Sequence, residues 1–161
     1  YMATMTGAEI EVSNDRYFRT SELLCCLTDT PRTNLNYYYP KISRPYRYVR
    51  FTPPPPAYPT ADCRAEIAEL AFFDSVDSEE HLPSKAIYGG GPVDENPAHD
   101  IDKACDDDWL TFYYSSGPQD SIVFDLQRAR VIKKILFVPR NDDNFVRVGD
   151  CLLYTSDAAD E

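Results

Sequence analysis

The chain has 161 residues, a length that suits one or two domains. It carries 13 prolines, 12 tyrosines and 8 phenylalanines with almost no long helical period, which favours an all-β protein. A formal charge of −11 argues against a nucleic-acid partner, because phosphate binding requires a basic surface, and no apolar run approaches the roughly 18 residues of a membrane span.

The first segment predicts strands separated by polar turns. Ala8, Ile10 and Val12 lie two residues apart, as on the buried face of a strand. Residues 13–15 (Ser-Asn-Asp) predict a turn, because Asn and Asp side chains bond their own backbone. The three consecutive tyrosines at 37–39 predict either a half-buried strand or a platform for stacking a sugar.

Four cysteines precede residue 151, and their spacing matches no metal motif. Cys25 and Cys26 are neighbours in an expected strand over 22–27, so their side chains point to opposite faces. We therefore expect free, buried thiols at these positions, with Cys63 and Cys105 as the other two.

Two further strands flank a proline-rich connection. Residues 46–51 (Tyr-Arg-Tyr-Val-Arg-Phe) predict a strand with Val49 and Phe51 on one face. Residues 52–59 must be extended, because each proline lacks an N–H and restricts its predecessor; a rigid loop or a site for proline-recognising domains would fit. Residues 65–73 suit a strand or a helix, and the strand is favoured by the paired phenylalanines at its end.

The strongest strand pattern lies in the last third of the chain. Ile122, Phe124 and Leu126 alternate with less apolar residues, and residues 131–138 form a second run rich in β-branched side chains. Pro139 ends this run, because proline cannot donate to a ladder. The short polar connection between the two runs predicts the central hairpin of an antiparallel sheet.

Several of these segments resemble discoidin-type (coagulation factor 5/8 C-type) modules. Residues 46–51 resemble the family's "aRYvRl" strand, and residues 65–73 its closing "i-A-E-l-e-f-y" strand. Residues 101–114 resemble its "A-x-D-G-D-x-x-T-x-w" loop, with Asp107 where glycine is usual, and residues 139–144 its "p-R-n/q-d" loop. The resemblance implies an all-β fold, an antiparallel β-sandwich of the discoidin or galactose-binding jelly-roll type.

The order of these segments predicts two half-modules. Residues 1–74 resemble the back half of one module and residues 83–150 the front half of the next, with residues 75–82 as an acidic linker. A half-sandwich leaves one sheet face bare, so we expect the halves to close into a single sandwich. The pattern also indicates tandem modules and attached domains in a larger parent protein, of which the chain would be a fragment.

Residues 151–161 resemble the translation of a sequencing-library adapter, and we exclude them from the fold prediction. A natural acidic terminus is the alternative interpretation. We expect this segment to pack against nothing specific.

The aspartate-rich loop is the candidate metal site. Asp106, Asp108 and Thr111 offer hard oxygen ligands at close spacing, as calcium requires. The family resemblance implies a structural Ca²⁺ here, with Glu69 from the 65–73 strand completing its shell. A solvated acidic loop is the alternative, and Asp107 in place of glycine would strain the turn.

The resemblance also implies a sugar site on the rim loops. Arg140, Asn141, Tyr113 and Tyr114 match positions where sugar-binding members place their contacts, although Arg140 could instead pair with the aspartates that follow it. We therefore expect a non-catalytic carbohydrate-binding or adhesion module of a secreted or cell-surface bacterial protein. A structural spacer or protein-interaction module without a sugar ligand is the alternative.

The sequence predicts no enzyme. Acidic residues are abundant, but abundance does not place two carboxylates at a defined separation. His81 and His99 lie in expected loops without a nucleophile motif nearby, and we interpret both as surface residues without partners.

Overall fold

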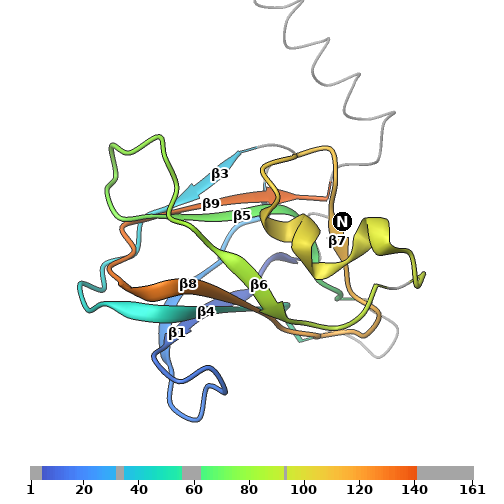
Figure 1. Cartoon of the computed structure of the whole chain (residues 1–161), viewed down its shortest axis with the longest axis horizontal. Coiled ribbons are helices and arrows are strands. Elements are labelled where there is room, and N and C mark those ends of the chain that lie inside the picture. Colours follow the sequence, from blue (N-terminus) through green and yellow to red (C-terminus); the bar gives the residue numbers. More distant parts are fainter. Residues whose placement is uncertain (1–4, 32–34, 56–62, 93, 141–161) are drawn as a thin grey trace, which may run out of the picture.

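A computed structural model describes residues 5–31, 35–55, 63–92 and 94–140 of the chain. All of its strand pairings are antiparallel, and the strands form two sheets that face each other (Figure 1). The predicted all-β antiparallel sandwich is therefore confirmed. Within the described residues, no helix has the length and hydropathy needed to span a bilayer.

One sheet has five strands and the other has four, and each combines strands from both predicted half-modules. The five-stranded sheet has the order β2-β1-β4-β8-β6. Its strands are β1 (Glu9–Ser13), β2 (Glu22–Cys26), β4 (Tyr46–Thr52), β6 (Lys85–Tyr88) and β8 (Ile122–Arg130). The four-stranded sheet, in the order β3-β9-β5-β7, contains β3 (Asn36–Tyr38), β5 (Glu66–Phe73), β7 (Tyr113–Tyr114) and β9 (Lys134–Pro139). The two segments thus close into one sandwich, as expected.

Alternation along the strands builds the core between the sheets. Val49 and Phe51, predicted to share one face of a strand, are fully buried in β4. Phe51 stacks on Phe137 of β9 with ring centroids 5.7 Å apart, so this pair joins the two sheets. Phe72 and Phe124 form a second bridge, edge to face at 5.6 Å. Such aromatic pairs add to the free energy gained from burying their area.

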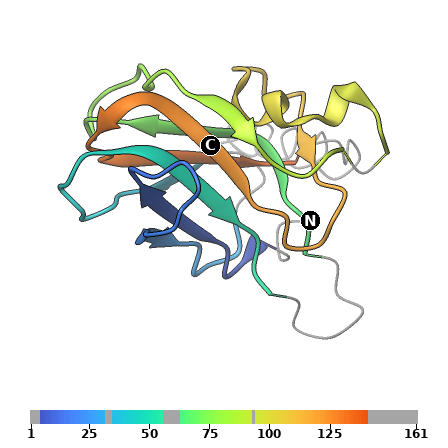
Figure 2. The ribbon, with the colours of Figure 1, turned by 60° about the horizontal axis from the view of Figure 1, so that its bottom comes forward.

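The predicted hairpin of the two C-terminal runs is wrong. β8 pairs with β4 and β6, whereas β9 lies in the other sheet between β3 and β5. Gln127, within β8, has a positive φ of 70°. After β8, the link 131–133, in which Ile132 is buried, takes the chain from the five-stranded sheet to the four-stranded sheet (Figure 2). β9 is buried along its whole length, which explains why its sequence is apolar without alternation.

The acidic segment predicted as a linker between modules connects β5 to β6 inside the sandwich. Leu82 is buried, and its N–H donates to the carbonyl of Phe72 at 2.7 Å. The Lys134 ammonium, from β9, donates to the carbonyls of Val76 at 3.2 Å and Ser78 at 2.6 Å. Residues 74–82 therefore form a loop anchored to β5 and β9, the two central strands of the four-stranded sheet.

The four cysteines that the structure describes are free thiols, as predicted. Cys63 is buried, whereas Cys25, Cys26 and Cys105 are half-buried. Burial raises the pKa of Cys25 to about 12, with its neighbour Cys26 adding to the shift. The Cys25 thiol is therefore unreactive at neutral pH.

Two short 3-10 helices, η2 (Pro97–His99) and η3 (Ile101–Cys105), lie at one end of the sandwich (Figure 1). Asn96 caps η2 by accepting from the N–H of Ala98, and Asp100 occupies the cap of η3. This segment leads into the aspartate-rich loop and then into β7.

We expect Phe137→Ala to destabilise the fold by about 3–5 kcal/mol, because it removes a fully buried ring that joins the sheets. Urea unfolding measures the loss. Leu23→Ala on the edge strand β2, where the side chain is 50% exposed, is the control and should cost well under about 1 kcal/mol. Equal losses for the two variants would contradict this arrangement of the core.

Candidate functional site

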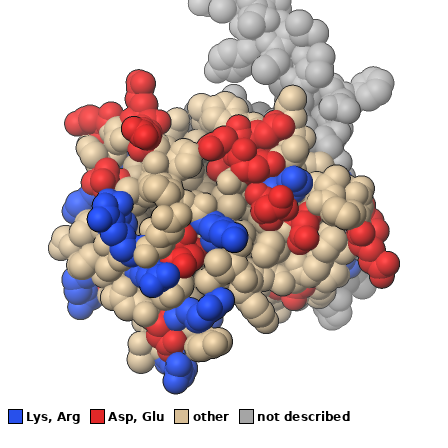
Figure 3. Space-filling model, viewed as in Figure 1, with Lys and Arg blue, Asp and Glu red and all other residues tan. Residues whose placement is uncertain are grey.

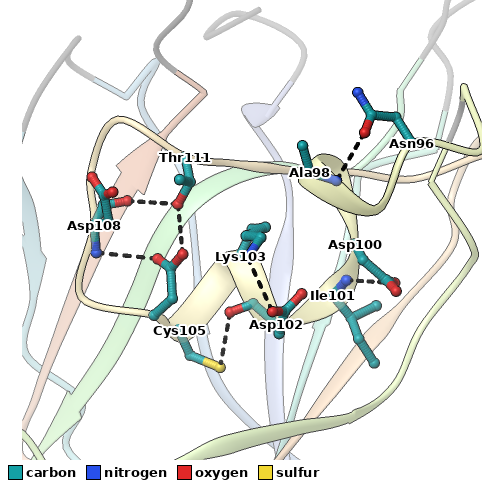
Figure 4. A network of polar contacts seen from close by, with 10 residues as sticks. Asn96, Ala98, Asp100, Ile101, Asp102, Lys103, Cys105, Asp108 and Thr111 are labelled. Carbon is teal, nitrogen blue, oxygen red and sulfur yellow. Dashed lines mark hydrogen bonds and ion pairs between the residues drawn. The ribbon is translucent and has the colours of Figure 1, made fainter.

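The aspartate-rich loop is held by its own side chains. Asp106 Oδ1 accepts from the N–H of Asp108 at 3.1 Å, and Asp106 Oδ2 accepts from Thr111 Oγ1 at 2.7 Å (Figure 4). Asp108 Oδ1 accepts from the N–H of Leu110 at 2.9 Å. The two bonds to N–H groups are turns in which a carboxylate bonds the backbone two residues onward. Three of the four carboxylate oxygens of Asp106 and Asp108 therefore accept hydrogen bonds within the loop.

Asp107 and Glu69 connect this loop to the four-stranded sheet. Asp107 adopts a left-handed φ of 62°, a conformation that Asp tolerates better than most residues, which is how the chain does without the expected glycine. Its N–H donates to Glu69 Oε2 at 3.1 Å. Glu69 of β5 therefore reaches the loop, as the family resemblance implied.

Glu69 is a buried carboxyl group whose pKa is raised. Its side chain is only 2% exposed. Burial raises its pKa to about 8, and the Asp107 carboxylate adds to this, while the Asp107 N–H acts in the opposite direction. The group is therefore mostly protonated at neutral pH.

The predicted calcium ligands are neighbours but do not converge. Asp106, Asp108, Thr111 and Glu69 lie in one region, yet most of their bonded oxygens face backbone N–H groups. In the part of the chain that the structure describes, no three His, Cys, Asp or Glu side chains are arranged to hold a metal ion. Calcium binding stays a prediction.

Calcium at these residues would have to replace hydrogen bonds within the loop, and binding to the folded state would raise the melting temperature. If the sequence prediction holds, millimolar calcium raises the midpoint in the 161-residue chain and fails to do so in Glu69→Gln. An unchanged midpoint in the parent chain would leave a loop held only by its hydrogen bonds.

We expect stability to fall as the pH rises from about 5 to 8, because folded Glu69 keeps a proton that the unfolded chain releases near the ordinary glutamate pKa of 4.5. Stability from this group is fully present below pH 4.5 and lost as the pH passes about 8. The total loss is on the order of a few kcal/mol. Urea unfolding across this range measures it, and Glu69→Gln should flatten the profile; a variant with an unchanged slope would contradict the assignment.

His81 joins the acidic loop to residues 74–82, contrary to its interpretation as a surface residue without partners. Its Nδ1 lies 2.8 Å from the carbonyl of Leu82 and its Nε2 lies 2.7 Å from Asp107 Oδ1. Burial lowers the pKa of His81, but the hydrogen bonds to Leu82 and Asp107 outweigh it, so the net shift is upward. His81 and Asp107 are 26 residues apart, and no local pattern indicates the pair.

His99 also has partners. Its Nδ1 lies 2.9 Å from Asp94 Oδ2, and its ring stacks on Phe112 at 4.4 Å. Both contacts belong to the packing of the η2 segment, so His99 has a structural role.

A groove of about 430 Å³ lies beside this network, over the outer face of the four-stranded sheet. Strands β3, β5 and β9 and the two acidic loops supply its lining residues: Tyr37, Glu69, Ala71, Phe73, Ser78, Glu79, His81, Asp107, Trp109, Lys134 and Leu136. A concave site with an apolar base and a few polar groups has the usual composition of a small-ligand site.

Two exposed aromatic side chains distinguish this groove. Tyr37 is 44% exposed and Trp109 is 45% exposed, and they come from β3 and from the aspartate-rich loop. The half-buried strand predicted at 37–39 is confirmed for Tyr37 and Tyr38 in β3, with Tyr38 packed against the core and Tyr37 in the groove, whereas Tyr39 lies beyond the strand. Trp109 was not among the predicted ligand contacts, although it is the only tryptophan of the chain.

Arg140 lies outside the groove, at the opposite end of β9 from Lys134, and is held by packing. Its Nη1 donates to Glu66 Oε1 at 3.0 Å. Its guanidinium lies over the rings of Phe112 at 4.6 Å and Tyr114 at 4.5 Å. The side chain is only 12% exposed, and Glu66 is its ionic partner among the described residues. The aspartates that follow it lie outside the described residues.

The other predicted sugar contacts separate into three positions. Tyr113 is fully buried and its hydroxyl donates to the carbonyl of Gly90 at 3.1 Å, so this ring is not available at the surface. Alternation along β7 places Tyr114 on the other face, beside Arg140. Asn141 lies outside the described residues, as do residues 151–161.

Acidic side chains gather on one face of the molecule, over the aspartate-rich loop and over residues 74–82 (Figure 3). Residues 74–82 and 106–111 contain no Lys or Arg. Comparison with protein-family models, curated proteins and solved structures found no match for the chain.

Proposed function

We propose that this chain is a non-catalytic carbohydrate-binding module, and that the groove over the four-stranded sheet is its ligand site. The observation that supports this is the pair of exposed aromatic rings, Tyr37 and Trp109, in a groove that also contains buried and exposed carboxyl groups. The ligand would be a glycan presented to a secreted or cell-surface protein, with further domains attached to the module.

Sugar chemistry matches this lining. A pyranose presents an apolar face of C–H groups, which packs on aromatic rings, and hydroxyls that need acceptors and donors around the edge. Phe73, Ala71 and Leu136 supply an apolar base, and Glu79 and Asp107 supply acceptors. The groove volume of about 430 Å³ falls within the range of small-ligand sites.

Arg140 does not line this groove, so it is not among the ligand contacts proposed there. The Arg140 guanidinium already pairs with Glu66 and lies over two rings, so its removal would disturb packing whether or not a sugar binds there. Contacts of Arg140 and Tyr114 with a sugar remain predictions. The rival function is a spacer that holds other domains apart, for which the exposed rings of the groove would have no role.

We expect a glycan array to detect reproducible binding by the full chain and at least about tenfold weaker binding by Trp109→Ala, because a stacked ring is lost. Trp109 is half-exposed, so its removal should leave the melting temperature nearly unchanged. Circular dichroism checks this.

Tyr39→Ala is the matched control, because Tyr39 is an exposed ring outside the groove lining. It should bind as the parent chain does. Absence of binding to any glycan by the parent chain, or equal loss in both variants, would favour the spacer.

A further inference from the structure

The cationic side chains of the groove are already occupied. Lys134 directs its ammonium to the carbonyls of Val76 and Ser78 and lies 4.4 Å from the centre of the Phe73 ring. Both ring nitrogens of His81 bond within the protein, to Leu82 and Asp107. Lys134 and His81 are the only cationic residues in the described lining, and their N–H groups already bond within the protein, so a ligand in the groove meets few free donors there.

Its anionic acceptors, by contrast, remain available. Asp107 uses Oδ1 for His81, and Oδ2 accepts no hydrogen bond from the described residues. The carboxylate of Glu79 likewise has no partner within the described ranges, and both side chains are exposed. A ligand in the groove therefore meets unused acceptors.

Acidic residues in the two loops around the groove add negative charge. Residues 74–82 carry four acidic side chains and residues 106–108 carry three, with no Lys or Arg in either loop. At physiological salt the screening length is about 8 Å, so charges on loops that line the groove act on a ligand inside it. The indole ring of Trp109 also attracts a cation through its face. The Tyr37 ring already has the Lys134 ammonium 5.5 Å from its centre, so its contribution is to the stacking of the sugar.

We propose that the groove selects an amino sugar whose amine is free and protonated, and disfavours sugars that carry carboxylate or sulfate groups. This inference rests on the proposed function, because it names the class of glycan. Aromatic rings hold the sugar face, and Asp107 and Glu79 accept hydrogen bonds from the ammonium. An N-acetyl group removes the charge, so acetylated sugars lose the ionic contacts and keep the stacking.

Isothermal titration calorimetry of the full chain at about pH 5.5 tests this with three probes of equal length: a glucosamine tetramer, its N-acetylated counterpart and a galacturonic acid tetramer. We expect the glucosamine tetramer to bind at least about tenfold more tightly than either other probe. Raising the salt should reduce that preference, because salt screens the ionic contacts.

Two variants test the residues. Asp107→Asn keeps a residue that tolerates the left-handed backbone at φ 62°, and Glu79→Gln changes an exposed loop position. Each should reduce glucosamine binding several-fold and leave binding of the acetylated tetramer almost unchanged. Glu80→Gln is the control, since Glu80 is exposed beside Glu79 but does not line the groove.

The outcomes separate the inference from the proposed function. Equal binding of the glucosamine and acetylated tetramers, or tighter binding of the galacturonic acid tetramer, would overturn the inference while supporting a glycan module. A loss in Glu80→Gln equal to that in Glu79→Gln would also overturn it, because the attraction would not be local to the groove. Binding of a tetralysine peptide with none of the three sugars would overturn both.

Discussion

Burial of β9 on both faces is the constraint on which the rest of the structure depends. Its inward face joins the sheets through the stack of Phe137 on Phe51. Its outward face carries Leu136 and Val138 into a second apolar cluster with residues of β5. Both faces of β9 can be covered only because the chain crosses to the four-stranded sheet after β8. This one crossing therefore places one face of β9 in the core and the other at the base of the groove.

The same strand organises the polar layer outside the sheet. Lys134, at its start, binds two carbonyls of the 74–82 loop, and Glu69 on the neighbouring strand β5 accepts from the aspartate-rich loop. His81 then joins the two loops through Asp107. Two acidic segments that are far apart in the chain are thereby fixed around one groove, and the cost of burying Glu69 is met by its protonation.

A sandwich of this architecture does not by itself assign a function, because sheets of this type support many binding surfaces and simple spacers. A glycan ligand is proposed on the chemistry of the groove: exposed aromatic rings, cationic groups that already bond within the protein, and unused carboxylate oxygens. The Arg140 stack at the other end of β9 has the opposite character, since its charge is paired and its rings are covered.

Local patterns in the sequence determined most of the strands, because alternation with period two records which face of β1 and β4 is buried. The family resemblance also anticipated that Glu69 meets the aspartate-rich loop. The sheet in which β9 lies was decided only by tertiary structure, since a strand buried on both faces has no alternation to show its orientation. The same is true of the His81–Asp107 pair and the groove, because contacts between residues distant in sequence leave no periodic signal in either segment.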